Sequence, residues 1–239
     1  MSRGADDEEA AEIQPLLDKE PSSGPNSWCL CRKVGHAGLK RLEQHHHRVI
    51  EFAFGLAAVG TLCACIALMG AFATGSLLKM LSWMEVHGPK FDAHVGVRSF
   101  CLEFHDGRSE CKNWSDMDCG AVASQSNVHP CELAQAGSKL IMIPVVIGTL
   151  TYLKFLVNTY HRYTGNDSNC CKTMSCWSAL FGGINLMSTL WAFHATHVAT
   201  IHAFYHLTAE AGVCWFLMVG AMGLKITAGM LHLALPVKQ

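Results

Sequence analysis

Charged residues are scarce in this chain: Asp, Glu, Lys and Arg make up 15% of its 239 residues, less than in a typical soluble domain. The formal net charge is only −1, so the chain lacks the basic field with which proteins bind nucleic acids. It also lacks a phosphate-binding loop, a dinucleotide-binding glycine motif and a nucleophile elbow. Half of the residues are hydrophobic, which favours a membrane protein.

The hydrophobic residues gather in four long stretches, at about residues 52–78, 140–157, 177–204 and 212–235. A helix needs about 20 apolar residues to cross a bilayer. We therefore predict an all-α membrane protein with a bundle of four transmembrane helices and a disulfide-held first outer loop, residues 79–139, that contains short strands. Residues 49–236 would form the membrane domain. Residues 1–48 would be a cytosolic tail ending in a short juxtamembrane helix, and residues 237–239 the cytosolic carboxyl end.

Lys and Arg predict which side each loop faces, because cytosolic loops carry an excess of both. Five of them lie in the segment from Arg32 to Arg48, and Arg162 and Lys172 lie between the second and third stretches. The turn predicted at 206–211, between the third and fourth stretches, has none. We therefore expect both termini in the cytosol and the large loop outside the cell or in a lumen.

The 12 cysteines divide according to this orientation. An oxidising compartment would join the four in the outer loop into two disulfides, with three possible pairings among which the sequence does not choose: Cys101, Cys111, Cys119 and Cys131. Five others lie near the membrane on the cytosolic side, where S-acylation sites or plain thiols fit better than zinc ligands, because paired Cys-x-x-Cys spacing is absent: Cys29, Cys31, Cys170, Cys171 and Cys176.

Two short motifs bear on where the protein resides. Asn113 begins an Asn-Trp-Ser sequon in the outer loop, which predicts a glycoprotein. Glu12, followed after three residues by Leu16 and Leu17, resembles the acidic dileucine signal that sorting adaptors read. The pattern is short and also fits an inert tail. We expect the plasma membrane or, where the signal is used, an endolysosomal membrane.

The segment between the first two outer-loop cysteines resembles the signature of the amastins, four-span surface proteins of kinetoplastid parasites. When the cysteines are aligned, the glycine of the signature comes one residue before Gly107. Glu103, His105 and Asp106 also differ from the signature. The topology matches over about residues 50–236, and claudins share this layout but not the motif. The resemblance implies a cell-surface or endolysosomal protein with no established reaction. The family motif consists of Cys101, Leu102, Phe104, Gly107, Arg108, Glu110 and Cys111.

Ionisable residues inside apolar stretches are functional candidates. At about 100° per residue, His194 and His197 share one helix face, and His202 and His206 share another. They predict either a metal, haem or proton site, with help from outer-loop histidines, or histidines that simply hydrogen-bond across helices. No carboxylate or thiol at fixed spacing completes a metal ligand set. A third interpretation is that their protonation near pH 6.5 changes how the outer loop packs on the helices.

Lys225 lies inside the fourth apolar stretch, on one helix face with Ala221 and Gly229. A charge at this depth should face protein or water rather than lipid. The sequence leaves open whether the side chain reaches the membrane surface or serves a function inside the bundle, with Glu51 as a possible partner.

These features favour a non-enzymatic tetraspan surface protein that organises the membrane or contacts a host or partner through its first outer loop. Its partners would be the lipid bilayer and other membrane proteins or a second copy, with no cofactor. The alternative is a transporter, a channel or a subunit that handles metal, haem or protons with the third-stretch histidines. An enzyme is disfavoured because no nucleophile–base pair can be assigned.

Overall fold

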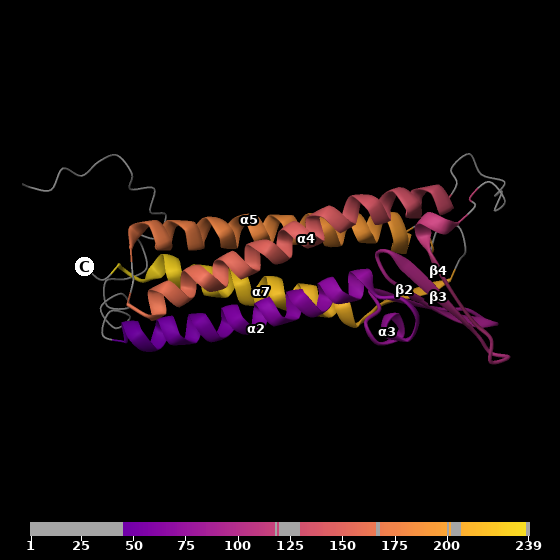
Figure 1. Cartoon of the computed structure of the whole chain (residues 1–239), viewed down its shortest axis with the longest axis horizontal. Coiled ribbons are helices and arrows are strands. Elements are labelled where there is room, and N and C mark those ends of the chain that lie inside the picture. The colour runs from indigo at the N-terminus through magenta and orange to yellow at the C-terminus, as the bar shows by residue number, and fades with distance from the viewer. Residues whose placement is uncertain are drawn as a thin grey trace, which may run out of the picture.

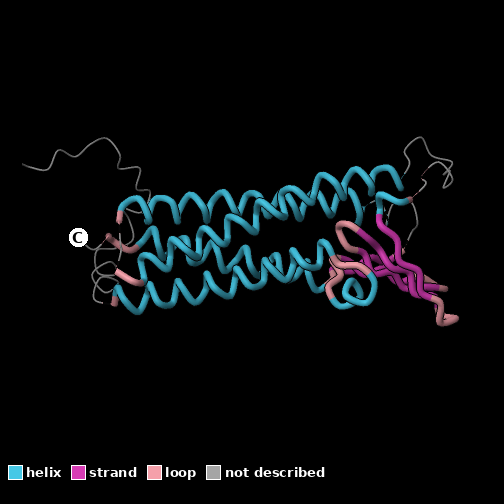
Figure 2. The backbone as a smooth tube through the Cα atoms, in the orientation of Figure 1, coloured by secondary structure: helices cyan, strands magenta, loops and turns pink. Residues whose placement is uncertain are grey.

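The computed structural model describes residues 45–117, 119, 130–165, 168–199, 201 and 207–237. Several predicted features lie outside these residues: Glu12, Leu16, Leu17, Cys29, Cys31, His202 and His206. The described chain forms long helices that run side by side, with one small sheet at one end of them (Figures 1 and 2). The long helices are α2 (His46–Phe72), α4 (Pro130–Tyr163), α5 (Asn169–Phe193) and α7 (Val213–Ala234).

Three of these helices, α2, α4 and α7, are long and apolar enough to cross a membrane. Helix α2 packs against α4 and α7, and α5 packs against the same two helices, so each long helix has two long neighbours. The expectation of a mostly helical chain with membrane-spanning helices and short strands is confirmed to this extent. Pro144 lies within α4, where its carbonyl accepts a hydrogen bond from the Asn185 amide of α5 at 2.6 Å.

The helix bounds differ from those of the predicted apolar stretches. Helix α4 begins at Pro130 rather than near residue 140, so the outer loop is shorter than predicted. Helix α2 ends at Phe72, and the short helix α3 (Gly75–Met80) follows it. Hydropathy marks the part of a helix that fits the bilayer core, whereas backbone hydrogen bonding continues into its polar ends. The third predicted stretch begins inside α5 and continues into the π-helical turn η2 (His194–Val198).

The sheet has five antiparallel strands in the order β4-β3-β2-β1-β5. Strand β5 precedes α7 and pairs with β1, with Met84 opposite Ala211 and His87 opposite Thr208. The prediction of a turn at 206–211 is therefore wrong for residues 208–211, which form β5. Such a short strand has no detectable period of its own, and its partner lies more than a hundred residues away in the chain. The strands are β1 (Met84–His87), β2 (Phe91–Val95), β3 (Ser99–Phe104), β4 (Ser109–Asn113) and β5 (Thr208–Ala211).

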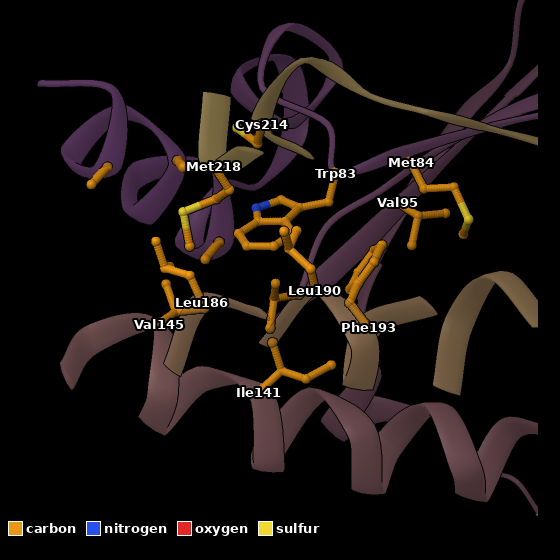
Figure 3. Packing of buried hydrophobic residues seen from close by; sticks show 14 of the residues in the cluster. Trp83, Met84, Val95, Ile141, Val145, Leu186, Leu190, Phe193, Cys214 and Met218 are labelled. Atoms are coloured by element: carbon orange, nitrogen blue, oxygen red, sulfur yellow. The ribbon is translucent and has the colours of Figure 1, made fainter. Parts of the chain in front are cut away.

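One buried cluster joins the sheet to the helices. Trp83, just before β1, is fully buried, and its ring centroid lies 5.3 Å from that of Phe193 on α5. Figure 3 shows other apolar side chains around this indole, including Leu190 and Met218. Burial of aromatic side chains contributes a large share of packing energy, so the sheet is fixed to the ends of the helices rather than tethered to them.

Small residues let the helices approach closely, as the sequence of α2 predicts. Ala64, Ala67 and Gly70 are buried on the face of α2 that meets its neighbours. A Cβ atom at Gly70 would collide with the Cys214 sulfur at the start of α7. Glycine is therefore required by the close approach of the two helices.

Candidate functional site

The motif segment forms the hairpin of strands β3 and β4. Cys101 and Cys111 lie directly opposite each other and are joined by a disulfide. At the tip, Gly107 has φ +90°, a left-handed conformation that glycine adopts without strain. Asp106 accepts hydrogen bonds from the Arg108 backbone N–H at 3.1 Å and from its Nε at 2.8 Å. The hairpin is therefore closed by a covalent bond at its base and by a charged pair at its tip.

A second disulfide joins Cys119 to Cys131 in the first turn of α4. Both disulfides expected of the four outer-loop cysteines are thus present, and the structure selects one of the three possible pairings. The first holds β3 to β4 within the sheet, and the second joins the segment after β4 to the helical part of the molecule. This arrangement restricts the conformations that the loop can adopt.

The sequon and the membrane-near cysteines lie at opposite ends of the molecule. Asn113 ends β4, is half-buried, and donates from its side-chain amide to Asp116 at 2.8 Å. Cys170 and Cys171 lie in the first turn of α5, at the end away from the sheet, where Cys170 is exposed and Cys171 is half-buried. Cys176 lies further along α5 and is also half-buried. The two groups of residues therefore lie at opposite ends of the long helices.

The outer face of the sheet carries histidines interleaved with carboxylates. His87 Nδ1 lies 2.8 Å from Asp92, and His94 lies between Glu85 at 3.9 Å and Glu103 at 3.7 Å. We call these five residues, with His105 and Lys79, the outer-face cluster. His105 Nε2 is 3.7 Å from Asp92, and Lys79 Nζ is 3.0 Å from Glu103.

These contacts shift the pKa values of three members of the outer-face cluster, His87, Asp92 and Glu103. The hydrogen bond to Asp92 raises the pKa of His87, and the same bond lowers the pKa of Asp92. The hydrogen bond from Lys79 lowers the pKa of Glu103. The carboxylates of this face outnumber Lys79, and protonation of His87 adds a positive charge among them. Acidification therefore reduces the negative charge of the outer face.

An apolar cavity of about 230 Å³ lies between the inner face of the sheet and the helix ends. Val86, Ala93 and Leu102 line it from three strands, and Ala134 lines it from α4. The other described lining residues are Phe91, Val95, Phe100, Trp114, Met117, Cys131, Thr196, His197, Ile201 and Leu207. Leu102 of the family motif therefore contributes to the cavity rather than to the outer face.

His197 is the titratable side chain among the described residues lining this cavity, and it is 1% exposed. It lies in the π-helical turn η2, a rare geometry often found at functional sites. Its ring stacks on Phe193 at 4.7 Å between centroids and meets Trp114 edge-on at 5.5 Å. Its Nε2 atom is buried and has no hydrogen-bond partner in the described part of the chain.

The predicted histidine group does not share one environment. His194 is exposed, whereas His197 is buried. Within residues 45–117, 119, 130–165, 168–199, 201 and 207–237, no group of three or more His, Cys, Asp or Glu residues has the geometry to hold a metal ion. A metal site built from His194 and His197 alone therefore lacks further described ligands.

Lys225 is buried among α4, α5 and α7 rather than reaching the membrane surface. It is 1% exposed, and Ala221 and Gly229 are buried with it, as the helix periodicity predicts. Its Nζ donates to Thr151 Oγ1 at 2.8 Å and lies 3.9 Å from the Tyr152 ring centroid. Glu51 is exposed, and in the described chain no carboxylate forms an ion pair with Lys225.

The outer-face cluster is a feature that motif reasoning missed, although a signal is present. Acid and histidine recur two residues apart in Glu85 and His87, and again in Asp92 and His94. A period of two places such pairs on one face of a strand. The signal acquires meaning only when the strands are assigned. No protein-family model matches this chain, and neither does any curated protein.

Proposed function

We propose that this chain is a non-enzymatic, amastin-like four-span membrane protein that contacts a protein partner through the outer face of its sheet. The observation that carries the proposal is the disulfide-bonded sheet at one end of long apolar helices, with its histidine–carboxylate face exposed. Two disulfides favour an oxidising compartment, and therefore an outer or luminal position for the sheet.

Helix α5 supplies the fourth span in this proposal. It exposes an apolar stripe at helical spacing through Trp177, Phe181, Ile184 and Trp191, each more than half exposed. In water such a stripe would be unfavourable, whereas lipid accommodates it without cost. The neighbouring faces of α5 pack against α4 and α7, so the stripe is the face left for the bilayer.

The charge of the outer face indicates the chemistry of the partner. At neutral pH its carboxylates outnumber its lysine, so a basic protein surface is complementary. Protonation of His87 weakens that attraction in an acidic compartment. We therefore propose contact at the cell surface and release in an endolysosomal lumen.

Site-specific photo-cross-linking in intact cells tests this proposal. A photo-reactive amino acid replaces Thr208 on the outer face, and the same residue at Leu62, exposed on α2, serves as the lipid-facing control. We expect a defined protein adduct from position 208 alone, decreasing between pH 7 and 5. Asp92→Lys together with Glu103→Lys should abolish it. An adduct that survives this charge reversal, or none at either pH, would contradict the proposal.

Topology is tested separately through Asn113. We expect a glycan that is lost in Asn113→Gln, together with labelling of Cys170 only after the cytosolic side is opened. An unglycosylated Asn113 with Cys170 labelled from outside would reverse the proposed orientation.

The buried Lys225 favours a second candidate, a protein that moves protons or ions. Ionisable residues inside a helical bundle commonly mark ion pathways. Thr151 and Tyr152 surround the ammonium, and a Cβ atom at Gly182 would collide with it. Proton flux into liposomes containing the purified protein, lost in Lys225→Met, would support this candidate. Equal flux in liposomes with and without the protein would remove it.

A further inference from the structure

The cavity beneath the sheet combines an apolar wall with one buried polar atom. Thr196 Oγ1 donates to the Ala192 carbonyl at 2.7 Å, so it accepts from His197 Nδ1 at 2.8 Å. This network assigns the proton to Nδ1 and leaves a lone pair on Nε2. Nδ1 is bonded to a side chain of the residue's own helix, whereas Nε2 is the ring nitrogen without a partner in the described chain. Because His197 lines the cavity, its Nε2 is the hydrogen-bond acceptor nearest to a ligand bound there.

We propose that this cavity binds a small alcohol, with its apolar body between the sheet and the helices and its hydroxyl donating to His197 Nε2. A buried acceptor without a partner costs free energy, which a donor from the ligand recovers. The acceptor is fixed in place because the imidazole is held between Phe193 and Trp114. The alcohol is bound without any covalent step.

Other occupants satisfy the site less well. A buried water needs two to four polar partners, and the Thr196 hydroxyl is already engaged. A carboxylate would lose its hydration in an apolar wall. A metal ion would find no described ligand set. A neutral molecule with one hydroxyl requires only what the cavity provides.

The volume sets the size of the ligand. At about 230 Å³ the cavity is larger than an engineered cavity of roughly 150 Å³ that takes up benzene. It is smaller than the pockets of about 300–1,000 Å³ that hold drug-sized ligands. A cyclic terpene alcohol with a single ring is within these limits, whereas a whole sterol exceeds them. The proposal is therefore restricted to small alcohols.

Menthol and p-menthane form a matched probe pair because they differ only in the hydroxyl group. The full-length protein is purified in detergent micelles with carbon-13-labelled methionine methyl groups. Met117 lines the cavity and reports binding there, while Met69 is exposed on α2 and reports partition into the micelle. Replacement of each methionine by leucine assigns its signal.

We expect menthol to shift the Met117 signal to saturation, and p-menthane to do so about tenfold more weakly, which corresponds to about 1.4 kcal/mol. His197→Phe keeps an aromatic ring beside Phe193 and should make the two probes bind equally. Ala134→Phe, or Ala93→Leu on the sheet side, should fill the cavity and remove both responses. Equal binding of the probes to the native protein would overturn the proposal. So would an unshifted Met117 signal, or a menthol preference that persists in His197→Phe.

Discussion

The guanidinium of Arg162 on α4 donates a hydrogen bond to Nδ1 of His232 on α7 across 2.8 Å, and both side chains are buried. The same guanidinium donates to the His232 carbonyl at 3.2 Å and to the Pro236 carbonyl at 3.4 Å. An arginine only donates, so His232 Nδ1 accepts and its Nε2 donates to Thr159 at 3.0 Å. This contact closes the end of the molecule opposite the sheet.

Replacing this arginine tests how much the contact stabilises the bundle. Arg162→Leu leaves buried acceptors on α7 without their donor, which costs about 1–3 kcal/mol. We expect a lower thermal unfolding midpoint in detergent. Lys154→Leu is the matched control, because this exposed lysine lies on the same helix and its loss should change stability by less than about 0.5 kcal/mol. Equal midpoints for the two variants would contradict the assigned role.

The hairpin disulfide gives a second prediction. Cys101→Ser together with Cys111→Ser removes a constraint on a short loop, and we expect a loss of about 2–3 kcal/mol. The hairpin tip should become sensitive to added protease near Arg108 while the helices remain protected. Cys170→Ser removes an exposed thiol and should leave the cleavage pattern unchanged. Cleavage in both variants, or in neither, would show that the disulfide does not hold the hairpin.

The pair of His87 and Asp92 predicts a pH dependence. Because the pKa of His87 is raised in the folded protein, its contribution to the stability of the sheet is complete below about pH 6.5. This contribution is lost as the pH rises through the pKa of the folded state. Because the pKa of Asp92 is lowered in the folded protein, its contribution to the stability of the sheet is complete above about pH 3.8. This contribution is lost as the pH falls through the pKa of the folded state. The pair therefore stabilises the sheet most between about pH 4 and 6.5.

Nuclear magnetic resonance of the histidine ring protons measures this shift. We expect Asp92→Asn to bring the pKa of His87 back toward its ordinary value. Asp106→Asn is the control, because Arg108 and not a histidine causes the lowered pKa of Asp106. A His87 titration that is the same in both variants would show that Asp92 is not its partner.

The sequence predicts the helices because hydropathy is a local property. A run without charged residues, such as that from Phe52 to Leu78, indicates a membrane helix whatever lies around it. The face of Lys225 is predictable for the same reason, since helical periodicity alone brings it together with Ala221. Helix ends are less predictable, because α4 continues past its apolar part at both ends.

Non-local pairing explains what the sequence leaves open. Strand β5 is defined by its hydrogen bonds to β1, and the two disulfides by which cysteines the fold brings together. The difference between His194 and His197 depends on packing around the π-helical turn, which no periodic pattern anticipates. The cavity is likewise formed by residues spread along the chain from Val86 to Leu207 and has no signature in any one segment.

Close packing between α2 and the start of α7 gives the last prediction. Gly70 is buried, and a Cβ atom there would collide with the Cys214 sulfur and lie 2.7 Å from the Leu81 carbonyl oxygen. Gly70→Ala should therefore destabilise the protein by about 1–3 kcal/mol through overpacking. Gly55→Ala, on the same helix, meets no atom within 4 Å and should raise stability by about 0.5–1 kcal/mol.

A double variant separates the two contacts of Gly70. Cys214→Ala removes the sulfur but not the Leu81 carbonyl, so the combined variant should recover part of the loss caused by Gly70→Ala. Thermal unfolding in detergent gives the four midpoints of the cycle. Strict additivity of Gly70→Ala and Cys214→Ala would place the collision elsewhere, and a neutral Gly70→Ala would show that α2 and α7 are not in close contact at this position.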